Sequence, residues 1–387
     1  MPNTLTEHTM VDTDDGLVAL CDSLAQAPYL ILDTEFLRER TYRPELCLVQ
    51  IKYQSILACI DTLAVKDLTP LFELLHSRDI EKVFHAASQD LEIFYLLSKK
   101  VPGPLFDTQV AAPLLGYNEQ IGYANLVNEH LSVELSKSQT RADWTRRPLS
   151  ESQVQYALDD VIHLENLYLS IKSELKEAER LSWLDEEFSN AEAPEKYEQP
   201  AKLRWRKIRN IQRYKGPTLS VIQALATWRE LKAREINQPR NWLMKDEVLA
   251  TLAQQKPDSE KELGHIRGLD RKTRDRFGAE LLAEIARVKN SDPEPLPPFV
   301  KKVKLTPERL ACVQLLNAWV HQRAGELSIA ASILAPQKTL EKMVSGSGRD
   351  ALEGWRDRLI GDDLQSILNG EASVCVTGDG IKLLKSD

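Results

Sequence analysis

Four acidic residues and one tyrosine, in three short segments, have the types and spacing that metal-dependent chemistry needs. The segment I-L-D-T-E-F supplies Asp33 and Glu35, H-A-A-S-Q-D-L-E supplies Asp90, and Q-Y-A-L-D-D supplies Tyr156 and Asp160. Hard cations such as Mg²⁺ and Mn²⁺ prefer carboxylate oxygens, and two such ions can cleave a phosphodiester. The sequence therefore predicts phosphodiester cleavage, provided that the three segments converge in the folded chain.

The first acidic segment ends a predicted strand. Residues 29–32 read Y-L-I-L and are typical of a buried strand. Because side chains of a strand alternate between its faces, Asp33 and Glu35 are expected on the same side. Two carboxylates so close repel each other unless a cation lies between them. Taken alone, the segment also fits a strand that ends in a polar turn.

The second and third segments are predicted to lie at helix starts. Ser88 is a candidate N-cap with Asp90 in the first turn, where the helix dipole alone would favour an acid. His85 has no partner at ligand spacing, so a packed or hydrogen-bonded role is expected. In the helix predicted from residue 150, which carries the third segment, Tyr156 and Asp160 are four residues apart and share one face. The alternative is an ordinary amphipathic helix with a half-buried tyrosine.

The elements that must position these residues alternate in a way that indicates a mixed sheet with helices on both faces. The expected helices are 15–26, 67–77, 88–99, 108–115 and a long one from 150 to about 180, and the expected strands are 29–36, 46–53, 55–60, 80–84 and one near 105.

Composition limits the class of protein. The chain has 387 residues, enough for two or three domains, with 42% hydrophobic and 28% charged residues. Its net charge of -8 argues against a general basic coat for nucleic acid. No apolar run is long enough to span a membrane, the N-terminus has no signal-peptide pattern, and five scattered cysteines suit a reducing cytoplasm. We therefore expect a cytoplasmic protein without a membrane partner.

One local basic segment stands out against this acidic background. Residues 201–216 contain seven Lys or Arg and no acid, with Trp205 and Tyr214 interleaved. Such a segment could hold a nucleic-acid backbone and stack bases; alternatively, it is a solvated helix face whose tryptophan packs onto the next domain. The candidate nucleic-acid contacts are Arg204, Arg206, Lys207 and Arg209.

The C-terminal half contains an internal repeat. The segment L-A-T-W-R-E-L-K-A-R-E from Leu225 aligns with L-N-A-W-V-H-Q-R-A-G-E from Leu316, so that Trp228 matches Trp319 at an offset of 91. After a shortening of eight, R-F-G-A-E-L-L-A-E-I matches L-I-G-D-D-L-Q-S-I-L. Both copies predict small helical units, and the repeated tryptophan is expected in the core of each rather than as a platform for bases.

Together, the three acidic motifs resemble those of the DEDD superfamily of 3′→5′ exonucleases, whose tyrosine subclass has Tyr four residues before the last Asp, as Tyr156 stands here. The segments I-L-D-T-E-F-L-R-E-R-T-Y, L-C-L-V-Q-I and D-W-T-R-R-P-L-S resemble the ribonuclease D family within it. The repeat resembles paired helicase-and-ribonuclease-D C-terminal (HRDC) domains. The first copy carries P-R-N-W-L-M-K-D-E-V-L, whereas the second replaces Pro-Arg by Ala330-Ala331 and is more divergent.

The resemblance implies an α/β ribonuclease H-like exonuclease domain, a mixed sheet flanked by helices, followed by two small all-α HRDC-type domains. The expected boundaries are 1–188 for the exonuclease domain, 189–209 for a linker and the basic segment, 210–290 for the first HRDC domain, 291–299 for a Pro-rich linker, 300–372 for the second, divergent HRDC-like domain and 373–387 for a tail.

The resemblance also implies the site. Asp33, Glu35 and Asp160 would ligate one divalent ion, Mg²⁺ or Mn²⁺. Asp33 would bridge to a second ion, where Asp90 would act partly through water, and Tyr156 would position the attacking water. A free phenol has a pKa near 10, so it is expected to orient the water first and accept a proton second.

The function so implied is that of a 3′→5′ exoribonuclease that trims tRNA precursors and other structured RNAs with a free 3′ end and releases nucleoside 5′-monophosphates. A monomer without an obligate protein partner is expected. One alternative is a 3′→5′ DNA exonuclease, which the lack of a polymerase or helicase module disfavours. Others are a non-catalytic RNA-binding adaptor or a helical interaction scaffold, which the four retained acids disfavour.

Overall fold

The computed structural model describes residues 6–135, 142–198, 200–290, 305–378 and 380–385. The Pro-rich linker predicted at 291–299 lies outside these residues. The chain forms two compact units. The first comprises residues 1–35, 47–193 and 302–387, and the second comprises residues 36–46 and 194–301.

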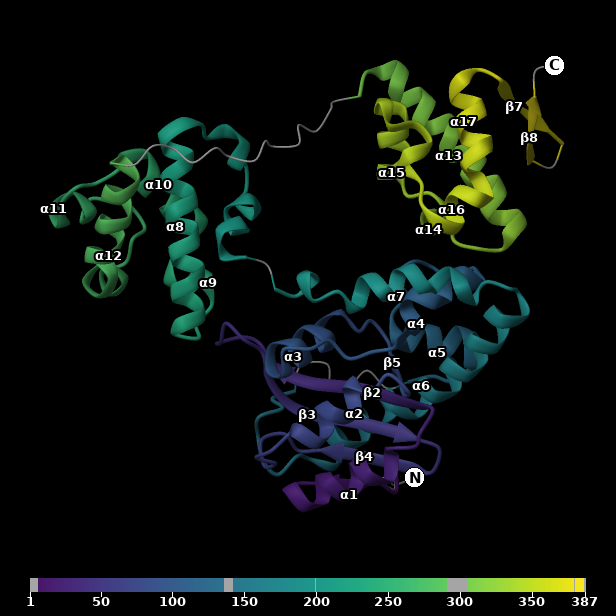
Figure 1. The fold of residues 1–387 in the computed structure, drawn as a ribbon, viewed down its shortest axis with the longest axis horizontal. Helices are drawn as coiled ribbons and strands as arrows, with labels where there is room; N and C mark the ends of the chain where they lie inside the picture. The colour runs from purple at the N-terminus through teal and green to yellow at the C-terminus, as the bar shows by residue number, and fades with distance from the viewer. Residues whose placement is uncertain (1–5, 136–141, 199, 291–304, 379, 386–387) are drawn as a thin grey trace. The chain divides into compact units, whose positions relative to one another are not determined.

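A six-stranded mixed sheet forms the centre of the first unit (Figure 1). In spatial order its strands are β1 (Thr9–Val11), β4 (Ile56–Ile60), β3 (Glu45–Tyr53), β2 (Tyr29–Leu37), β5 (Glu81–Phe84) and β6 (Leu105–Asp107). The pairs β1–β4, β2–β5 and β5–β6 are parallel, whereas β3–β4 is antiparallel. The mixed sheet was predicted, but β1 was not, because its three residues carry no pattern of their own.

Helices cover the sheet because its central strands are apolar on both sides. In β2, the consecutive residues Leu30, Ile31 and Leu32 are fully buried, which requires cover on both faces. The helices before the C-terminal repeat are α1 (Asp14–Leu24), α2 (Thr69–His76), α3 (Ser88–Ser98), α4 (Thr108–Ala111), α5 (Tyr123–Leu131), α6 (Glu151–Glu177) and α7 (Asp185–Glu192), with short 3₁₀ turns at Ala112–Leu115 and Leu181–Leu184.

The start of each site helix is fixed differently. Helix α6 begins as predicted, with a reciprocal capping box between Ser150 and Gln153. The prediction of Ser88 as an N-cap was wrong: α3 begins at Ser88, after Ala87 as the N-cap, and no side chain caps it. Instead, the carboxylate of Asp107 on β6 accepts hydrogen bonds from the amides of Ala86 and Ala87, each at 2.9 Å.

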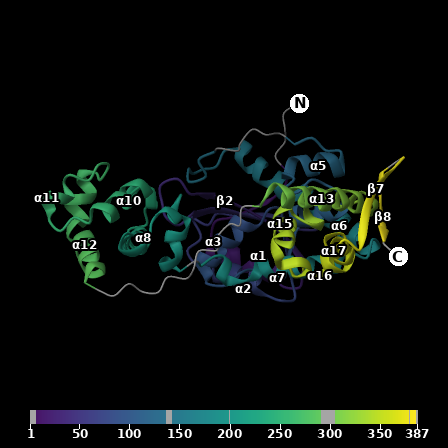
Figure 2. The same ribbon diagram turned by 90° about the horizontal axis from the view of Figure 1, so that it is seen from above.

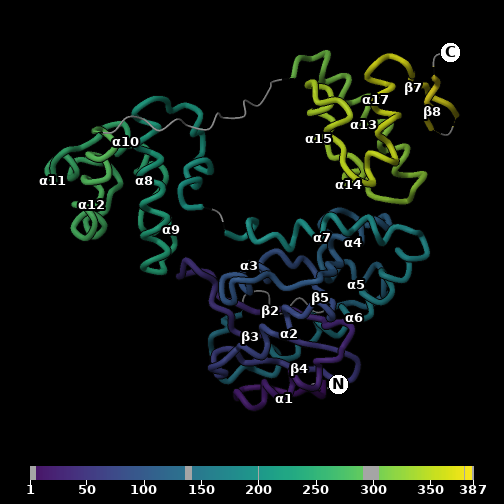
Figure 3. Tube along the Cα trace, viewed as in Figure 1, coloured from purple at the N-terminus to yellow at the C-terminus, as the bar shows by residue number. Residues whose placement is uncertain are grey.

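The second unit is helical and encloses its own core. It contains a 3₁₀ segment (Ala201–Lys207), α8 (Gly216–Glu235), α9 (Arg240–Leu243), α10 (Asp246–Gln255), α11 (Glu260–Leu263) and α12 (Arg271–Lys289), with α10 and α12 packed on α8 (Figure 3). Trp205 is 2% exposed within this core, and Tyr214 packs against it. The alternative interpretation of the basic segment, in which its tryptophan packs, therefore holds for Trp205.

The repeat predicted from the sequence recurs in three dimensions. The C-terminal helices are α13 (Pro307–Leu327), α14 (Ala331–Leu334), α15 (Gln337–Lys342), α16 (Gly354–Arg356) and α17 (Asp362–Asn369), followed by an unpredicted antiparallel hairpin of β7 (Ala372–Thr377) and β8 (Gly380–Lys385) beside α17 and α13 (Figure 2). Helices α13, α14 and α15 begin at the positions equivalent to the starts of α8, α9 and α10.

The repeated tryptophans make the same contact in both copies. The indole Nε1–H of Trp228 donates to Glu280 at 2.7 Å, and that of Trp319 donates to Asp363 at 3.1 Å. Their exposures are 9% and 7%. Both therefore belong to a core, as predicted, and do not act as platforms for bases.

Two expectations about the class of protein can be compared with the structure. All five cysteines are free. Among the described residues, no helix combines the length and apolar character needed to cross a bilayer.

Candidate active site

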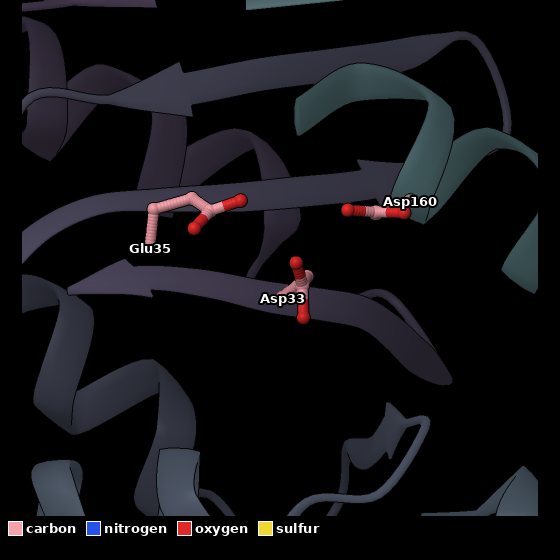
Figure 4. Close-up of side chains that lie close together, drawn as sticks. All are labelled: Asp33, Glu35 and Asp160. Carbon is pink, nitrogen blue, oxygen red and sulfur yellow. The ribbon is translucent and has the colours of Figure 1, made fainter. Parts of the chain in front are cut away.

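Three carboxylates converge where strand β2 faces helix α6. One oxygen from each of Asp33, Glu35 and Asp160 lies within 4.8 Å of the other two. Figure 4 shows the side chains of Glu35 and Asp160 directed toward each other, with Asp33 between them. The alternation of β2 places Asp33 and Glu35 on one side, and α6 brings Asp160 to them from more than 100 residues later in the chain.

Asp90 lies beside this triad rather than in it. It stands in the first turn of α3 and is 7% exposed. The hydroxyl of Thr34, the residue between Asp33 and Glu35, donates a hydrogen bond to its carboxylate. The charge of Asp90 contributes to raising the pKa of both Asp33 and Glu35, which places it close to the two strand acids.

Burial makes the site unfavourable for negative charge. Desolvation is the largest cause of a raised pKa at all four acids, and neighbouring carboxylates add to it. The pKa of Asp33 lies well above its usual range, that of Glu35 is raised to about 8, and those of Asp90 and Asp160 to about 7. An all-oxygen set of carboxylates that are partly or fully buried and repel one another fits a hard divalent cation, which would neutralise the charge.

Tyr156 stands one helical turn before Asp160 on α6. Burial, followed by the charges of Asp160, Glu35 and Asp33, raises the pKa of its phenol far above the ordinary value. The phenol is therefore protonated at neutral pH and is available as a hydrogen-bond donor. This protonation state agrees with a residue that orients a ligand rather than one that removes a proton.

Two further aromatic side chains, His85 and Tyr123, pack against each other, and Tyr123 is close enough to the site for the charges of Asp160 and Asp33 to act on it. His85 lies with Nδ1 2.9 Å from the Thr108 hydroxyl and Nε2 3.0 Å from the Ile121 carbonyl, so it is hydrogen-bonded as predicted. Tyr123, on the unpredicted α5, donates to the Asp159 carbonyl at 2.9 Å and packs edge-on to His85. Tyr123 was not among the predicted site residues, and its only signal in the sequence is its place at the start of a short amphipathic segment.

The four basic candidates have different surroundings in the second unit. The guanidinium of Arg204 donates to Glu230, whose side chain is fully buried, at 3.0 Å. Arg206, Lys207 and Arg209 are exposed. The structure therefore gives Arg204 a place in the packing of this unit and leaves the other three side chains accessible.

The raised pKa values predict how the metal-free chain responds to pH. In the folded state the pKa values of Glu35, Asp90 and Asp160 are about 7 to 8, whereas in the unfolded chain such acids titrate near about 4. Between these limits the folded state binds more protons, so its stability is highest at low pH and falls as pH rises through the folded pKa values. In a chelator, the Tm should fall between pH 5 and about 8.

The control for this prediction is Asp33→Asn, which removes one of the four charges. The metal-free variant should have a higher Tm than the wild type at pH 8 and a weaker dependence of Tm on pH. Equal Tm values for the two proteins at pH 5 and pH 8 would contradict the assignment of repulsion to these acids.

Known proteins that resemble this chain over nearly its whole length are exonucleases of one family. The 3′-5′ exonuclease family profile matches residues 8–176, and the HRDC domain profile matches residues 218–285. Ribonuclease D of Granulibacter bethesdensis is 38% identical over 97% of this chain and 96% of its own length. Ribonuclease D of Sphingobium indicum is 37% identical over 98% and 99%.

A solved structure agrees. The crystal structure of Escherichia coli RNase D, described as an exoribonuclease involved in structured RNA processing, superposes with a TM-score of 0.82 at 30% identity and covers 94% of this chain and 99% of its own. These findings confirm the predicted fold class and the resemblance drawn from the acidic motifs. The chain belongs to the ribonuclease D family and is a 3′→5′ exoribonuclease.

Proposed function

We propose that Asp33, Glu35, Asp90 and Asp160 hold two divalent ions, Mg²⁺ or Mn²⁺, for the hydrolysis of the terminal phosphodiester. The observation that carries this proposal is the convergence of three partly buried carboxylates within 4.8 Å. Asp33, between Glu35 and Asp160 in Figure 4, is suited to be shared by both ions. Asp90, held by Thr34, would complete the second site directly or through water.

The four acids and Tyr156 have different roles in the proposed reaction. When bound, the ions would supply a nucleophilic water and neutralise charge on the attacking and leaving oxygens. The four acids would hold the ions, because they project from β2, α3 and α6 toward one another. The phenol of Tyr156 donates a hydrogen bond that orients the attacking water or the phosphate oxygen. Attack at the terminal linkage releases one nucleoside 5′-monophosphate.

We further propose structured RNAs with a free 3′ end, tRNA precursors among them, as substrates. Support comes from the relatives named ribonuclease D and from the structured-RNA role stated for the Escherichia coli protein. The test is digestion of a 3′-extended tRNA precursor and a DNA strand of the same sequence with Mg²⁺ or Mn²⁺. We expect stepwise shortening of the RNA, release of 5′-monophosphates and arrest by chelator. Internal cleavage, or faster loss of the DNA, would contradict the proposal.

The exposed part of the basic segment is proposed to contact the RNA backbone. Replacing Arg206, Lys207 and Arg209 together by Gln removes accessible positive charge. The dependence of RNA affinity on salt should weaken, with the slope of log K against log salt smaller by up to about 2, or about 0.7 per lost phosphate contact.

The matched control is Arg204→Gln in the same segment. Because Arg204 pairs with a buried carboxylate, this change should lower the Tm and leave the salt slope unaltered. An unchanged slope in the triple variant would show that the segment does not contact RNA.

A further inference from the structure

The loop before α6 places a tryptophan against the proposed water-orienting tyrosine. The Trp144 side chain is 5% exposed, and its ring centroid lies 6.2 Å from that of Tyr156 at an interplanar angle of 37°. Tyr156 is itself only partly buried, so its ring needs a neighbour to restrict rotation about its side-chain bonds. Trp144 supplies a large rigid surface on one side of the phenol.

The guanidinium of Arg147 joins the loop that carries Trp144 to the sheet. Arg147 donates from its terminal nitrogens to the carbonyls of Trp144 at 2.7 Å, Arg146 at 2.9 Å and Cys47 at 2.9 Å. It also forms a two-point ion pair with Asp61, at 2.5 Å and 2.7 Å. All five N–H groups of this guanidinium are therefore used, which fixes the loop far more firmly than one contact would.

The anchor of this loop is the catalytic sheet. Asp61 directly follows β4, and Cys47 lies in β3. Burial alone would raise the pKa of Asp61, but the hydrogen bonds and charge of Arg147 and the amides of Leu63 and Ala64 lower it overall. Asp61 is 7% exposed, whereas the side chain of Arg147 keeps 27% of its surface accessible. The pair is therefore only partly shielded from solvent, and its two-point charge-assisted geometry is what holds Arg147 in place.

We propose that Trp144, Arg147 and Asp61 are positioning residues for the reaction: the ion pair holds the Trp144 backbone to the sheet, and the indole holds the Tyr156 phenol over the acidic cluster. Trp144 and Arg147 lie in the same loop and Asp61 lies 86 residues before Arg147, and all three share one consequence, the orientation of the phenol. This inference rests on the proposed role of Tyr156. It adds that the orientation of the phenol depends on the Arg147–Asp61 ion pair, which does not itself contact the acidic cluster's proposed ligands.

The test is a double-mutant cycle measured as single-turnover cleavage of a 3′-extended RNA. Trp144→Leu and Arg147→Lys should each lower the rate by about tenfold to 100-fold, the range expected from a small misplacement of a catalytic group. Trp144→Phe, which keeps an aromatic ring, should lose less. The KM for RNA and the affinity for Mn²⁺ should stay within twofold, because none of these residues is among the proposed ligands.

The decisive comparison uses Tyr156→Phe as the background. If Trp144 acts through the phenol, Trp144→Leu should change the residual rate of Tyr156→Phe by less than twofold. An equal loss in both backgrounds, or a raised KM with an unchanged rate, would overturn the coupling while leaving the proposed function intact. Full activity of Tyr156→Phe alone would remove the proposed role of the phenol and, with it, this coupling, but not the proposed ion sites.

Two controls distinguish a loss of activity caused by unfolding from one caused by a misplaced phenol. Trp319→Leu removes an equally buried indole from the C-terminal helices and should lower the Tm without changing the cleavage rate. If Trp144→Leu does not fold, Trp144→Phe and Arg147→Lys provide the same cycle, and additive losses in either would still refute the coupling.

Discussion

Asp33→Asn should lower the rate of RNA cleavage by about three to four orders of magnitude, equivalent to about 4–5.5 kcal/mol of transition-state stabilisation. The reason is its place between Glu35 and Asp160, where one carboxylate can serve both ions. Asn keeps the shape but removes the charge, so the loss reports ion binding rather than packing. Single-turnover kinetics and calorimetric titration with Mn²⁺ measure the two effects.

Asp159→Asn is the matched control for this variant. Asp159 precedes the ligand candidate Asp160 but accepts a hydrogen bond from Gln155 at 2.7 Å instead of joining the triad. Its substitution should change the cleavage rate by less than about fivefold, the scale of a surface charge near a site. Retention of more than a tenth of the wild-type rate by Asp33→Asn would contradict the two-ion assignment.

Tyr156→Phe should lower the cleavage rate by about 100-fold to 1000-fold, the cost of losing one oriented hydrogen-bond donor at a reacting centre. Affinity for Mn²⁺ should persist because the four carboxylates remain. Since burial and the neighbouring acids hold the pKa of the phenol far above neutrality, the two proteins should show the same pH dependence below about pH 9.

Tyr168→Phe controls for the loss of a hydroxyl from the same helix. Tyr168 is buried on α6 and donates to Glu81 at 2.5 Å, so its substitution should lower the Tm and spare the rate. A Tyr156→Phe protein with a wild-type rate would exclude the phenol from the reaction, whereas loss of Mn²⁺ affinity would show that its hydroxyl supports the ion sites.

The sequence could predict which acids share a face on β2 and on α6 because strand alternation and helical spacing are local properties. The alternation of β2 placed Asp33 and Glu35 on one side, and the spacing on α6 put Tyr156 next to Asp160. Their convergence depends on the order of strands in the sheet, which no local pattern specifies. The resemblance to a known family supplied that part.

What could not be predicted depends on contacts between distant segments. The amides just before α3 are bound by Asp107 of strand β6, and Ser88 does not cap the helix. Arg204 looked accessible in a basic run, but a buried acid from α8 accepts its hydrogen bond. Trp144 lies in an irregular loop, where neither helical nor strand periodicity indicates what it faces.

The repeated Trp-to-carboxylate hydrogen bond has a consequence for how the two C-terminal copies can change. In both, an interior indole ties the first long helix to the last, at Glu280 and at Asp363. The short second helix of each copy differs. Trp242 of α9 is 60% exposed in the first copy, and Ile333 of α14 is the equivalent residue in the second. Because the contact that joins the helices is buried in both copies, the surface residues of each copy can differ without loss of the fold. Surface residues of one copy should therefore be tolerated at the equivalent positions of the other.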